Sequence, residues 1–213
     1  MSKGLFITFE GLDGAGKSTQ IQKVKEIFEQ KGFEVVLTRE PGGTDISEKI
    51  REIILDNDND EMSFVTEALL YAASRAQHVH EKIKPALDAG KVVICDRYVH
   101  SSIAYQGYGR GLGAEKVMAI NSHAIDGLLP DISFFILLPT DKAMERLKSS
   151  NRELDRLEVE QADFFQKVEE GYMKIAEEYD NIIKIDASKS VDEIAKVISD
   201  IIFKKINQLL QEG

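Results

Sequence analysis

The amino-acid sequence predicts an α/β protein built around a parallel β-sheet. Short runs of β-branched and aromatic residues alternate with longer amphipathic stretches along the chain, a pattern typical of parallel strands joined by crossover helices. The first apolar run leads into a glycine-rich segment and then a helical stretch, which is the order of a strand–loop–helix unit. The predicted strands are residues 5–9, 33–37, 92–96, 132–138 and 182–185.

Helices are expected between these strands and after the last one. Ile21, Val24 and Phe28 recur at helical spacing, and Gly32 follows as a residue type that often ends helices. Further helices are predicted at residues 63–87, 157–179 and 191–202. No Pro- or Gly-rich linker and no internal repeat divides the sequence. We therefore expect one domain over residues 1–213.

The composition of the chain argues against long nucleic acid and membranes as partners. The chain has 27 Lys and Arg against 37 Asp and Glu, a formal net charge of −10. Long nucleic acid is bound mainly by fields of Lys and Arg, so this balance argues against such a partner. No apolar run approaches the ~18 residues of a membrane span and no apolar leader begins the sequence, so we expect a cytoplasmic protein. Cys95 is the only cysteine, and its apolar neighbours predict a core position.

The strongest motif is GLDGAGKS at residues 11–18, which fits G-x-x-x-x-G-K-[ST] between a predicted strand and a helix. Glycines let backbone N–H groups turn towards phosphates, and the positive end of the next helix adds to the attraction. Lys17 is expected to reach the β- and γ-phosphates, and Ser18 to hold Mg²⁺. The motif predicts a nucleoside triphosphate site formed by Gly11, Leu12, Asp13, Gly14, Ala15, Gly16, Lys17, Ser18 and Thr19.

Cations near the carboxyl edge of the predicted sheet indicate a second anion site. Asp96 and Arg97 end the third strand, Arg39 follows the second, and Arg75 lies in a predicted helix. Open α/β sheets bind ligands at this edge, so several arginines there suggest a second phosphate. Asp96 is expected to hold Mg²⁺ together with Ser18, directly or through water. No N-K-x-D motif occurs, which argues against a GTPase.

Five motifs in order give the sequence a close resemblance to the bacterial thymidylate kinases. They are FEGLDGAGKST at 9–19, TREPGGT at 38–44, AASRAQH at 72–78, DRYVHSSIAYQG at 96–107 and RELDRLE at 152–158. The resemblance covers about residues 5–188. It implies a five-stranded parallel sheet flanked by helices, the three-layer fold of P-loop kinases with a short lid. It also implies a homodimer that transfers phosphate from MgATP to dTMP, giving dTDP for dTTP synthesis.

The resemblance assigns roles around the acceptor phosphate. Asp13 matches the acidic residue near the sugar 3′-hydroxyl and Mg²⁺, and Arg97 matches the arginine that grips the phosphate of dTMP. Arg39 and Glu40 would support that phosphate and the metal shell. Lys17, Arg97 and Asp13 are therefore expected to be catalytic. The acceptor is already an anion, so the reaction needs positioning and charge neutralisation and no general base.

The resemblance also assigns residues to the base and sugar of dTMP. Arg75 would hydrogen-bond the pyrimidine, and Ser102 and Gln106 match its polar neighbours. Tyr105 matches the ring that packs where a 2′-hydroxyl would lie, which would favour deoxyribose. Tyr71 stands where the family usually has a Phe that stacks on the base, so its hydroxyl needs a partner.

A polar, cation-rich segment at about residues 146–156 resembles the lid of the family. Another subgroup carries a basic residue where this chain has Gly14. The charge on the transferring phosphoryl group would then be neutralised from the lid, and Arg152 is the catalytic residue expected there.

Two other functions remain open at this point. A deoxynucleoside kinase would use Glu40 as the base that deprotonates a sugar hydroxyl, and it would phosphorylate thymidine. A non-catalytic nucleotide switch would explain the GLDGAGKS motif but would leave Arg75, Arg97 and Gln106 without a task.

Overall fold

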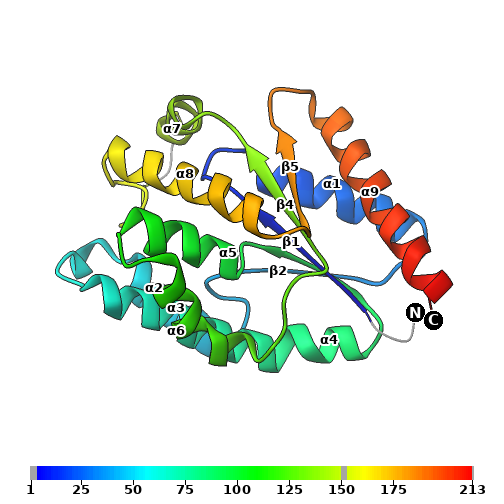
Figure 1. Cartoon of the computed structure of the whole chain (residues 1–213), viewed down its shortest axis with the longest axis horizontal. Helices are drawn as coiled ribbons and strands as arrows, with labels where there is room; N and C mark the ends of the chain where they lie inside the picture. Colours follow the sequence, from blue (N-terminus) through cyan, green and yellow to red (C-terminus); the bar gives the residue numbers. More distant parts are fainter. Residues whose placement is uncertain (1–3, 150–152, 213) are drawn as a thin grey trace.

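Five parallel strands form one central sheet in the described part of the chain, residues 4–149 and 153–212 of a computed structural model (Figure 1). The strand order is β2-β3-β1-β4-β5. The predicted parallel sheet flanked by helices is therefore confirmed. The strands are β1 Leu5–Glu10, β2 Val35–Arg39, β3 Val92–Asp96, β4 Ile132–Leu137 and β5 Ile182–Asp186.

The second strand is the one whose predicted position was wrong. Residues 33–37 were expected, but β2 starts at Val35 and ends at Arg39. Phe33 does not join the sheet because its ring packs against Phe28 and Phe203 of two helices, with centroids 5.4 and 6.2 Å away. An aromatic residue that suits a strand is here used to attach helices to the sheet.

The strand register brings the conspicuous polar residues to one edge. Asp96 of β3 pairs with Phe9 of β1 on one side and with Arg39 of β2 on the other. Because all strands run in the same direction, the segments that follow them meet beyond this carboxyl edge. The GLDGAGKS loop, Arg39 and Asp96 are therefore brought together by the sheet itself.

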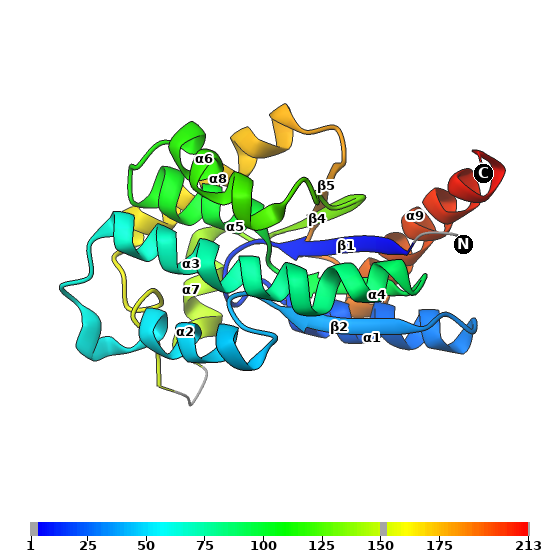
Figure 2. The ribbon, with the colours of Figure 1, turned by 90° about the horizontal axis from the view of Figure 1, so that it is seen from below.

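Helices cover both faces of the sheet and give three layers (Figure 2). α1 packs beside α9 on one face, whereas α3, α4, α5, α6 and α8 lie on the other. α2 and α7 lie beyond the carboxyl ends of the strands. The helix bounds are α1 Lys17–Gln30, α2 Asp45–Leu55, α3 Phe64–His78, α4 Lys84–Asp88, α5 Val99–Ser102, α6 Ala114–Ile125, α7 Thr140–Lys148, α8 Ala162–Glu178 and α9 Val191–Glu212. Shorter elements are the 3-10 turn η1 Asn57–Asn59 and the π-helical turns η2 Val79–Ile83 and η3 Ile103–Gly109.

The long helix predicted at 63–87 is present as α3, η2 and α4 in continuous succession. Ser63 caps its start, because the Ser63 side chain accepts a hydrogen bond from the N–H of Thr66 at 3.1 Å. Pro85 is the second residue after the wider π turn, and it has no N–H group to donate to that turn.

The helix predicted at 157–179 begins five residues later than expected, at Ala162. Asp155 holds the preceding residues in a turn, since its Oδ1 atom accepts from the N–H groups of Leu157 and Glu158 at 3.0 and 3.1 Å. Such side-chain bonding to the local backbone competes with helix formation.

The core lies between the sheet and its helices. Phe9, Ile94 and Phe134 are fully buried, and Cys95 is buried beside them as predicted. Burial raises the pKa of the Cys95 thiol, so it is held as an uncharged core group. Among the described residues, no helix is both long and apolar enough to cross a bilayer.

Candidate active site

The GLDGAGKS segment forms a loop between β1 and α1, with α1 starting at Lys17. Gly14 and Gly16 have φ of +81° and +93°, values that only glycine adopts without strain. Leu12 and Ala15 are packed in the core. A cavity over the loop is lined by Asp13, Gly14, Gly16, Lys17, Ser18 and Thr19. Gly11 is not among its lining residues.

Lys17 lies along the inside of the loop. Its Nζ atom donates to the carbonyl oxygens of Gly11 and Leu12 at 3.0 and 2.9 Å, and it lies 3.8 Å from the Asp13 carboxylate. Burial lowers the pKa of Lys17, and Arg97 lowers it further although Asp13 opposes both. A phosphate in the cavity would supply the negative charge that favours the ammonium form.

Gly14 touches helix α7. A Cβ atom at this position would lie 2.5 Å from the carbonyl oxygen of Ala143. The basic residue that another subgroup carries here therefore has no room unless α7 moves.

Ser18 and Asp96 fit a magnesium site. The Ser18 hydroxyl donates to Asp96 Oδ2 at 3.4 Å, and Asp96 Oδ1 is buried with no hydrogen-bond partner in the described structure. Mg²⁺ at phosphates typically takes one or two protein oxygens and completes its shell with water and phosphate. The described residues contain no cluster of three or more His, Cys, Asp or Glu that could hold a metal.

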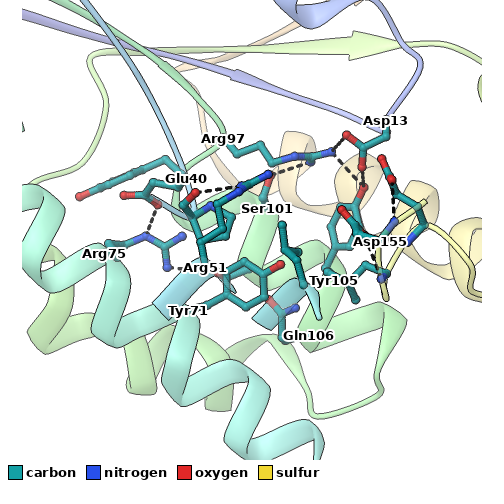
Figure 3. A pocket seen from close by; sticks show the side chains of 16 residues that line it. Asp13, Glu40, Arg51, Tyr71, Arg75, Arg97, Ser101, Tyr105, Gln106 and Asp155 are labelled. Carbon is teal, nitrogen blue, oxygen red and sulfur yellow. Dashed lines mark hydrogen bonds and ion pairs between the residues drawn. The ribbon is translucent and has the colours of Figure 1, made fainter. Parts of the chain in front are cut away.

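Arg97 connects the loop to a second cavity. Its Nη2 atom lies 2.8 Å from Asp13 Oδ1 and donates to the Tyr105 hydroxyl at 3.2 Å. The Tyr105 hydroxyl in turn donates to Asp13 Oδ2 at 3.4 Å. Figure 3 shows the Arg97 side chain reaching across to Asp13. Burial alone would lower the pKa of Arg97, but Asp13 and its other neighbours outweigh burial and raise it.

A buried network supports Arg97 from behind. Arg97 Nη1 donates to the Ser101 and Tyr172 hydroxyls, each at 3.2 Å. Ser101 also donates to Glu10, and Glu10 accepts from the N–H of Tyr98 at 2.9 Å. Arg97 itself has φ of +70°, an unusual backbone for a residue with a side chain. The guanidinium is therefore oriented by the backbone and, from behind, by the Ser101 and Tyr172 hydroxyls.

The second cavity is the candidate acceptor site (Figure 3). It shares four charged lining residues with the cavity over the loop, namely Asp13, Glu40, Arg51 and Arg97. The two cavities therefore meet at these side chains. The predicted acceptor residues that line it are Asp13, Glu40, Tyr71, Arg75, Arg97, Ser102, Tyr105 and Gln106.

Arg75 is almost completely buried and held on three sides. Its Nε atom donates to Glu40 Oε2 at 2.7 Å, and its Nη1 atom donates to Ser102 at 3.1 Å and to Asn121. The second Glu40 oxygen lies 2.9 Å from Nδ1 of His78. Both oxygens of Glu40 are thus engaged, and the arginine presents a fixed donor face to the cavity.

Tyr71 and Arg75 lie four residues apart on α3 and both line the acceptor cavity. Burial raises the pKa of the Tyr71 hydroxyl, and the nearby Glu67 carboxylate adds to this effect. Tyr71 therefore stays neutral and offers an aromatic face beside the Gln106 amide (Figure 3).

Arg39 lies apart from the acceptor cavity. It lines only the cavity over the loop, its side chain is half exposed, and its Nη2 atom pairs with Glu48 at 2.8 Å. The resemblance assigns Arg39 to the acceptor phosphate, whereas in the structure Arg39 lies beside the cavity over the GLDGAGKS loop. Arg51 of α2 lines both cavities instead and donates to the Pro41 carbonyl at 2.9 Å.

The lid segment is only partly a separate element. Residues 146–148 belong to α7, and Arg152 lies outside the described residues. Arg146 Nη1 donates to the Gly14 carbonyl at 3.4 Å. Arg156 is buried instead of exposed, because it donates to the carbonyl of Ile54 and to Glu67 at 2.9 and 2.6 Å.

Several residues of the site were missed by sequence reasoning. Arg51 and Asp155 line the acceptor cavity, His78 fixes Glu40, and Glu10 supports Arg97 through Ser101. Glu10, His78 and Asp155 lie inside three of the five motifs, and Arg51 is a cation on the helix after TREPGGT. Their roles depend on contacts between distant elements, which the motifs alone do not reveal.

Comparison with known proteins agrees with this geometry. The thymidylate kinase family model matches residues 9–198. A thymidylate kinase of Geobacillus sp. (strain WCH70) is 54% identical over 194 residues, which cover 90% of this chain and 92% of the relative. One from Clostridium novyi (strain NT) is 49% identical, covering 91% and 96%, and one from Bacillus pumilus (strain SAFR-032) is 48% identical, covering 94% and 98%. The chain belongs to the thymidylate kinase family.

Proposed function

We propose that this site transfers the γ-phosphate of ATP to dTMP, giving ADP and dTDP in the synthesis of dTTP. The observation that carries the proposal is the meeting of two cavities at Asp13, Glu40, Arg51 and Arg97. One cavity lies over the GLDGAGKS loop and the other is lined by aromatic, amide and guanidinium groups suited to a nucleotide base. A donor phosphate and an acceptor phosphate would face each other at that junction.

The loop residues hold the donor. Backbone N–H groups of the loop and the amino end of α1 attract the phosphates, and Lys17 moves from the carbonyls of Gly11 and Leu12 to the β- and γ-phosphates. Ser18 and Asp96 would hold Mg²⁺, which neutralises phosphate charge when bound. Each of these groups stabilises negative charge that spreads over the phosphoryl oxygens during transfer.

Arg97 positions the acceptor. Its guanidinium pairs with Asp13 at 2.8 Å, and the phosphate of dTMP would take over part of that pairing. Tyr105 and the Ser101 hydroxyl keep the guanidinium in place. The phosphate oxygen of dTMP is itself the nucleophile, so no residue has to remove a proton.

The geometry disfavours Glu40 as the base of a deoxynucleoside kinase. One Glu40 oxygen accepts from Arg75 and the other lies against His78, with the whole side chain 2% exposed. A general base must reach the hydroxyl from which it takes the proton, and this carboxylate is committed to Arg75. A nucleotide switch is disfavoured too, because it would have no use for a built acceptor cavity.

In this proposal, the negative charge on the transferring phosphoryl group is neutralised by the lid at about residues 146–156. Arg152 supplies the positive charge. Arg146 adds a second cation close to the loop through its contact with Gly14. Both arginines would act within a single P-loop kinase domain over residues 1–213.

We also propose a homodimer that uses the outer surface of α2 and α3. Five large apolar side chains are exposed there, namely Ile46, Ile53, Phe64, Val65 and Leu69. Exposed large apolar side chains that gather on neighbouring helices are typical of protein interfaces. Sedimentation of the protein and of Leu69→Glu distinguishes the dimer from a monomer. We place the enzyme in the cytoplasm, where ATP serves nucleotide synthesis.

A coupled ADP-release assay tests the function. MgATP is supplied with dTMP, dUMP, dCMP, dGMP or thymidine, and Lys17→Ala serves as the blank. Strongest turnover with dTMP supports the proposal. Turnover with thymidine alone would move the chemistry to a sugar hydroxyl, and turnover with none would favour the switch.

A further inference from the structure

A buried carboxylate lies beneath the acceptor cavity and outside the five sequence motifs. Glu67 of α3 is fully buried, and each of its oxygens accepts two hydrogen bonds. Oε1 accepts from Gln106 Nε2 at 2.9 Å and from Arg110 Nε at 3.2 Å. Oε2 accepts from Arg110 Nη2 at 3.1 Å and from Arg156 Nη2 at 2.6 Å. Four donor atoms from three residues therefore converge on one carboxylate.

The chemistry of this contact decides how Gln106 is oriented. Burial alone would raise the pKa of Glu67, but Arg110, Gln106 and Arg156 outweigh it and lower the pKa. An ionised carboxylate has only acceptors, so the group of Gln106 that faces it has to be the NH₂. The amide oxygen and nitrogen of Gln106 are thus distinguished by their partner.

The consequence is a carbonyl oxygen turned away from Glu67. Gln106 lines the acceptor cavity with Arg75 and Tyr71, and its Oε1 atom is buried with no hydrogen-bond partner in the described structure. A buried acceptor without a donor is costly. A ligand N–H group that reached this oxygen would remove the cost and gain the bond.

Arg75 complements this acceptor with a donor. Its Nε and Nη1 atoms are occupied by Glu40, Ser102 and Asn121, and no partner of Nη2 occurs among the described residues. The cavity thus offers a fixed N–H donor from Arg75 and a fixed oxygen acceptor from Gln106. Thymine and uracil present a matching edge, a carbonyl oxygen next to the N3–H group.

We propose that Glu67 is a positioning residue for base choice, which holds the Gln106 oxygen towards the base and thereby selects a ring N3–H over an unprotonated N3. Cytosine has a lone pair at N3, and two acceptors would then face each other. The inference rests on the proposed function, because the base concerned is that of the acceptor nucleotide. Glu67 itself touches no substrate.

The test compares Glu67→Gln with the wild-type enzyme on dTMP, dUMP and dCMP. In the variant, the Gln106 amide faces another amide and can turn over, so its NH₂ can face cytosine N3. We expect kcat/KM for dTMP relative to dCMP to fall about tenfold, the factor that corresponds to one lost buried hydrogen bond. The ratio of dTMP to dUMP should not change, because both bases carry N3–H.

Glu160→Gln is the matched control. Glu160 pairs with the other side of Arg110, is partly exposed and makes no contact with Gln106 among the described hydrogen bonds. The same change of charge there should leave both ratios as in the wild type. An equal loss of activity on all three nucleotides in Glu67→Gln would make Glu67 a structural residue only and overturn the proposal.

Two further measurements make the test decisive. Gln106→Met should lower the dTMP to dCMP ratio by itself, and adding Glu67→Gln should lower it no further, since Glu67 acts through Gln106. An additional fall in the double variant would contradict the proposal. Wild-type turnover on dTMP is a separate result, so failure of the proposed function is not confused with failure of this inference.

An NMR measurement covers the case in which Glu67→Gln does not fold. The side-chain amide of Gln106 in the wild-type protein, assigned with Gln106→Met, should exchange its protons with water far more slowly than that of Gln22. Gln22 also donates to a glutamate, Glu26 at 3.1 Å, but on the exposed surface of α1. Exchange as fast as that of Gln22 would show that Glu67 does not hold the amide.

Discussion

Arg97 Nη2 lies 2.8 Å from Asp13 Oδ1, and this ion pair joins the GLDGAGKS loop to the candidate acceptor cavity. The two residues are 84 positions apart and come from the ends of neighbouring strands β1 and β3. In the proposed function, the donor and acceptor phosphates face each other at this ion pair.

Removal of the Arg97 guanidinium should weaken the use of dTMP selectively. We expect Arg97→Ala to lower kcat/KM for dTMP, because charged hydrogen bonds of roughly 2–4 kcal/mol are lost. The dissociation constant for ATP should stay within a few-fold of the wild-type value. Steady-state kinetics and ATP titration measure the two effects. Lys23→Ala is the control, since Lys23 pairs with Asp192 on the surface. An unchanged kcat/KM for dTMP would remove Arg97 from the acceptor site.

Gly14→Ala should disturb the contact between the loop and α7. Left-handed backbone costs an alanine about 1–2 kcal/mol, and the new Cβ would also lie 2.5 Å from the Ala143 carbonyl. Gly32→Ala is a matched control, because its φ of +84° is similar but no atom lies within 4 Å of its Cβ position. We expect both variants to lower Tm, and only Gly14→Ala to weaken ATP binding. Equal ATP affinity in the two variants would contradict the contact.

Glu10 should make stability depend on pH. Burial raises its pKa from 4.5 to about 7, so between these values the folded chain keeps a proton that the unfolded chain has lost. The free energy of unfolding contributed by Glu10 therefore falls by about 1.4 kcal/mol for each pH unit from 4.5 to 7. Denaturant titrations give the free energy of unfolding of the wild type and of Glu10→Gln at each pH. The difference between the two proteins should change with pH by this slope.

His100 makes the free energy of unfolding depend on pH in the opposite direction. The effect of Glu10 therefore has to be measured against a variant. Burial lowers the pKa of His100 from 6.5 to about 3, so its contribution to the free energy of unfolding rises with pH between those values. The wild-type profile alone would show partial cancellation. His100 is present in both proteins and its Nδ1 atom lies 4.0 Å from Glu10 Oε1, so the difference between them reports Glu10 together with its coupling to His100. If the difference in the free energy of unfolding stayed constant from pH 5 to 7, the raised pKa of Glu10 would be contradicted.

Tyr71 should act through its ring and not through its hydroxyl. We expect Tyr71→Phe to keep KM for dTMP within about twofold and Tyr71→Ala to lose roughly 1–3 kcal/mol of base stacking. Initial-rate kinetics over a range of dTMP concentrations give both values. A large loss in Tyr71→Phe would instead assign the hydroxyl a direct role at the base.

The sequence predicts those parts of the site that follow from strand order. The loop at 11–18, Arg39 and Asp96 each come at or after the end of a parallel strand, so their shared edge follows from the fold class. The start of α3 follows from Ser63 as a cap. These features depend on residues close together in the sequence, where spacing and residue type carry the information.

The remaining features depend on packing between distant segments. Arg156 belongs to the segment predicted as a lid, and the structure buries it against Glu67, 89 positions earlier in the chain. The sequence leaves Glu40 open as a base, whereas in the structure its two carboxylate oxygens contact Arg75 and His78. Neither contact has a local signature, because a side chain's partner across the fold is set by how α2, α3 and the segment after α7 pack together.

The position of the transferred phosphorus tests the central claim most directly. The enzyme is incubated with ATP that carries ¹⁸O in its γ-phosphate and with unlabelled dTMP or, in a parallel reaction, thymidine. The products are separated, and the ¹⁸O is located by its isotope shift in ³¹P NMR. We expect the label only in the β-phosphate of dTDP, with no label in inorganic phosphate beyond that of Lys17→Ala. Label released as inorganic phosphate, or transferred to thymidine but not to dTMP, would contradict phosphoryl transfer between the two cavities.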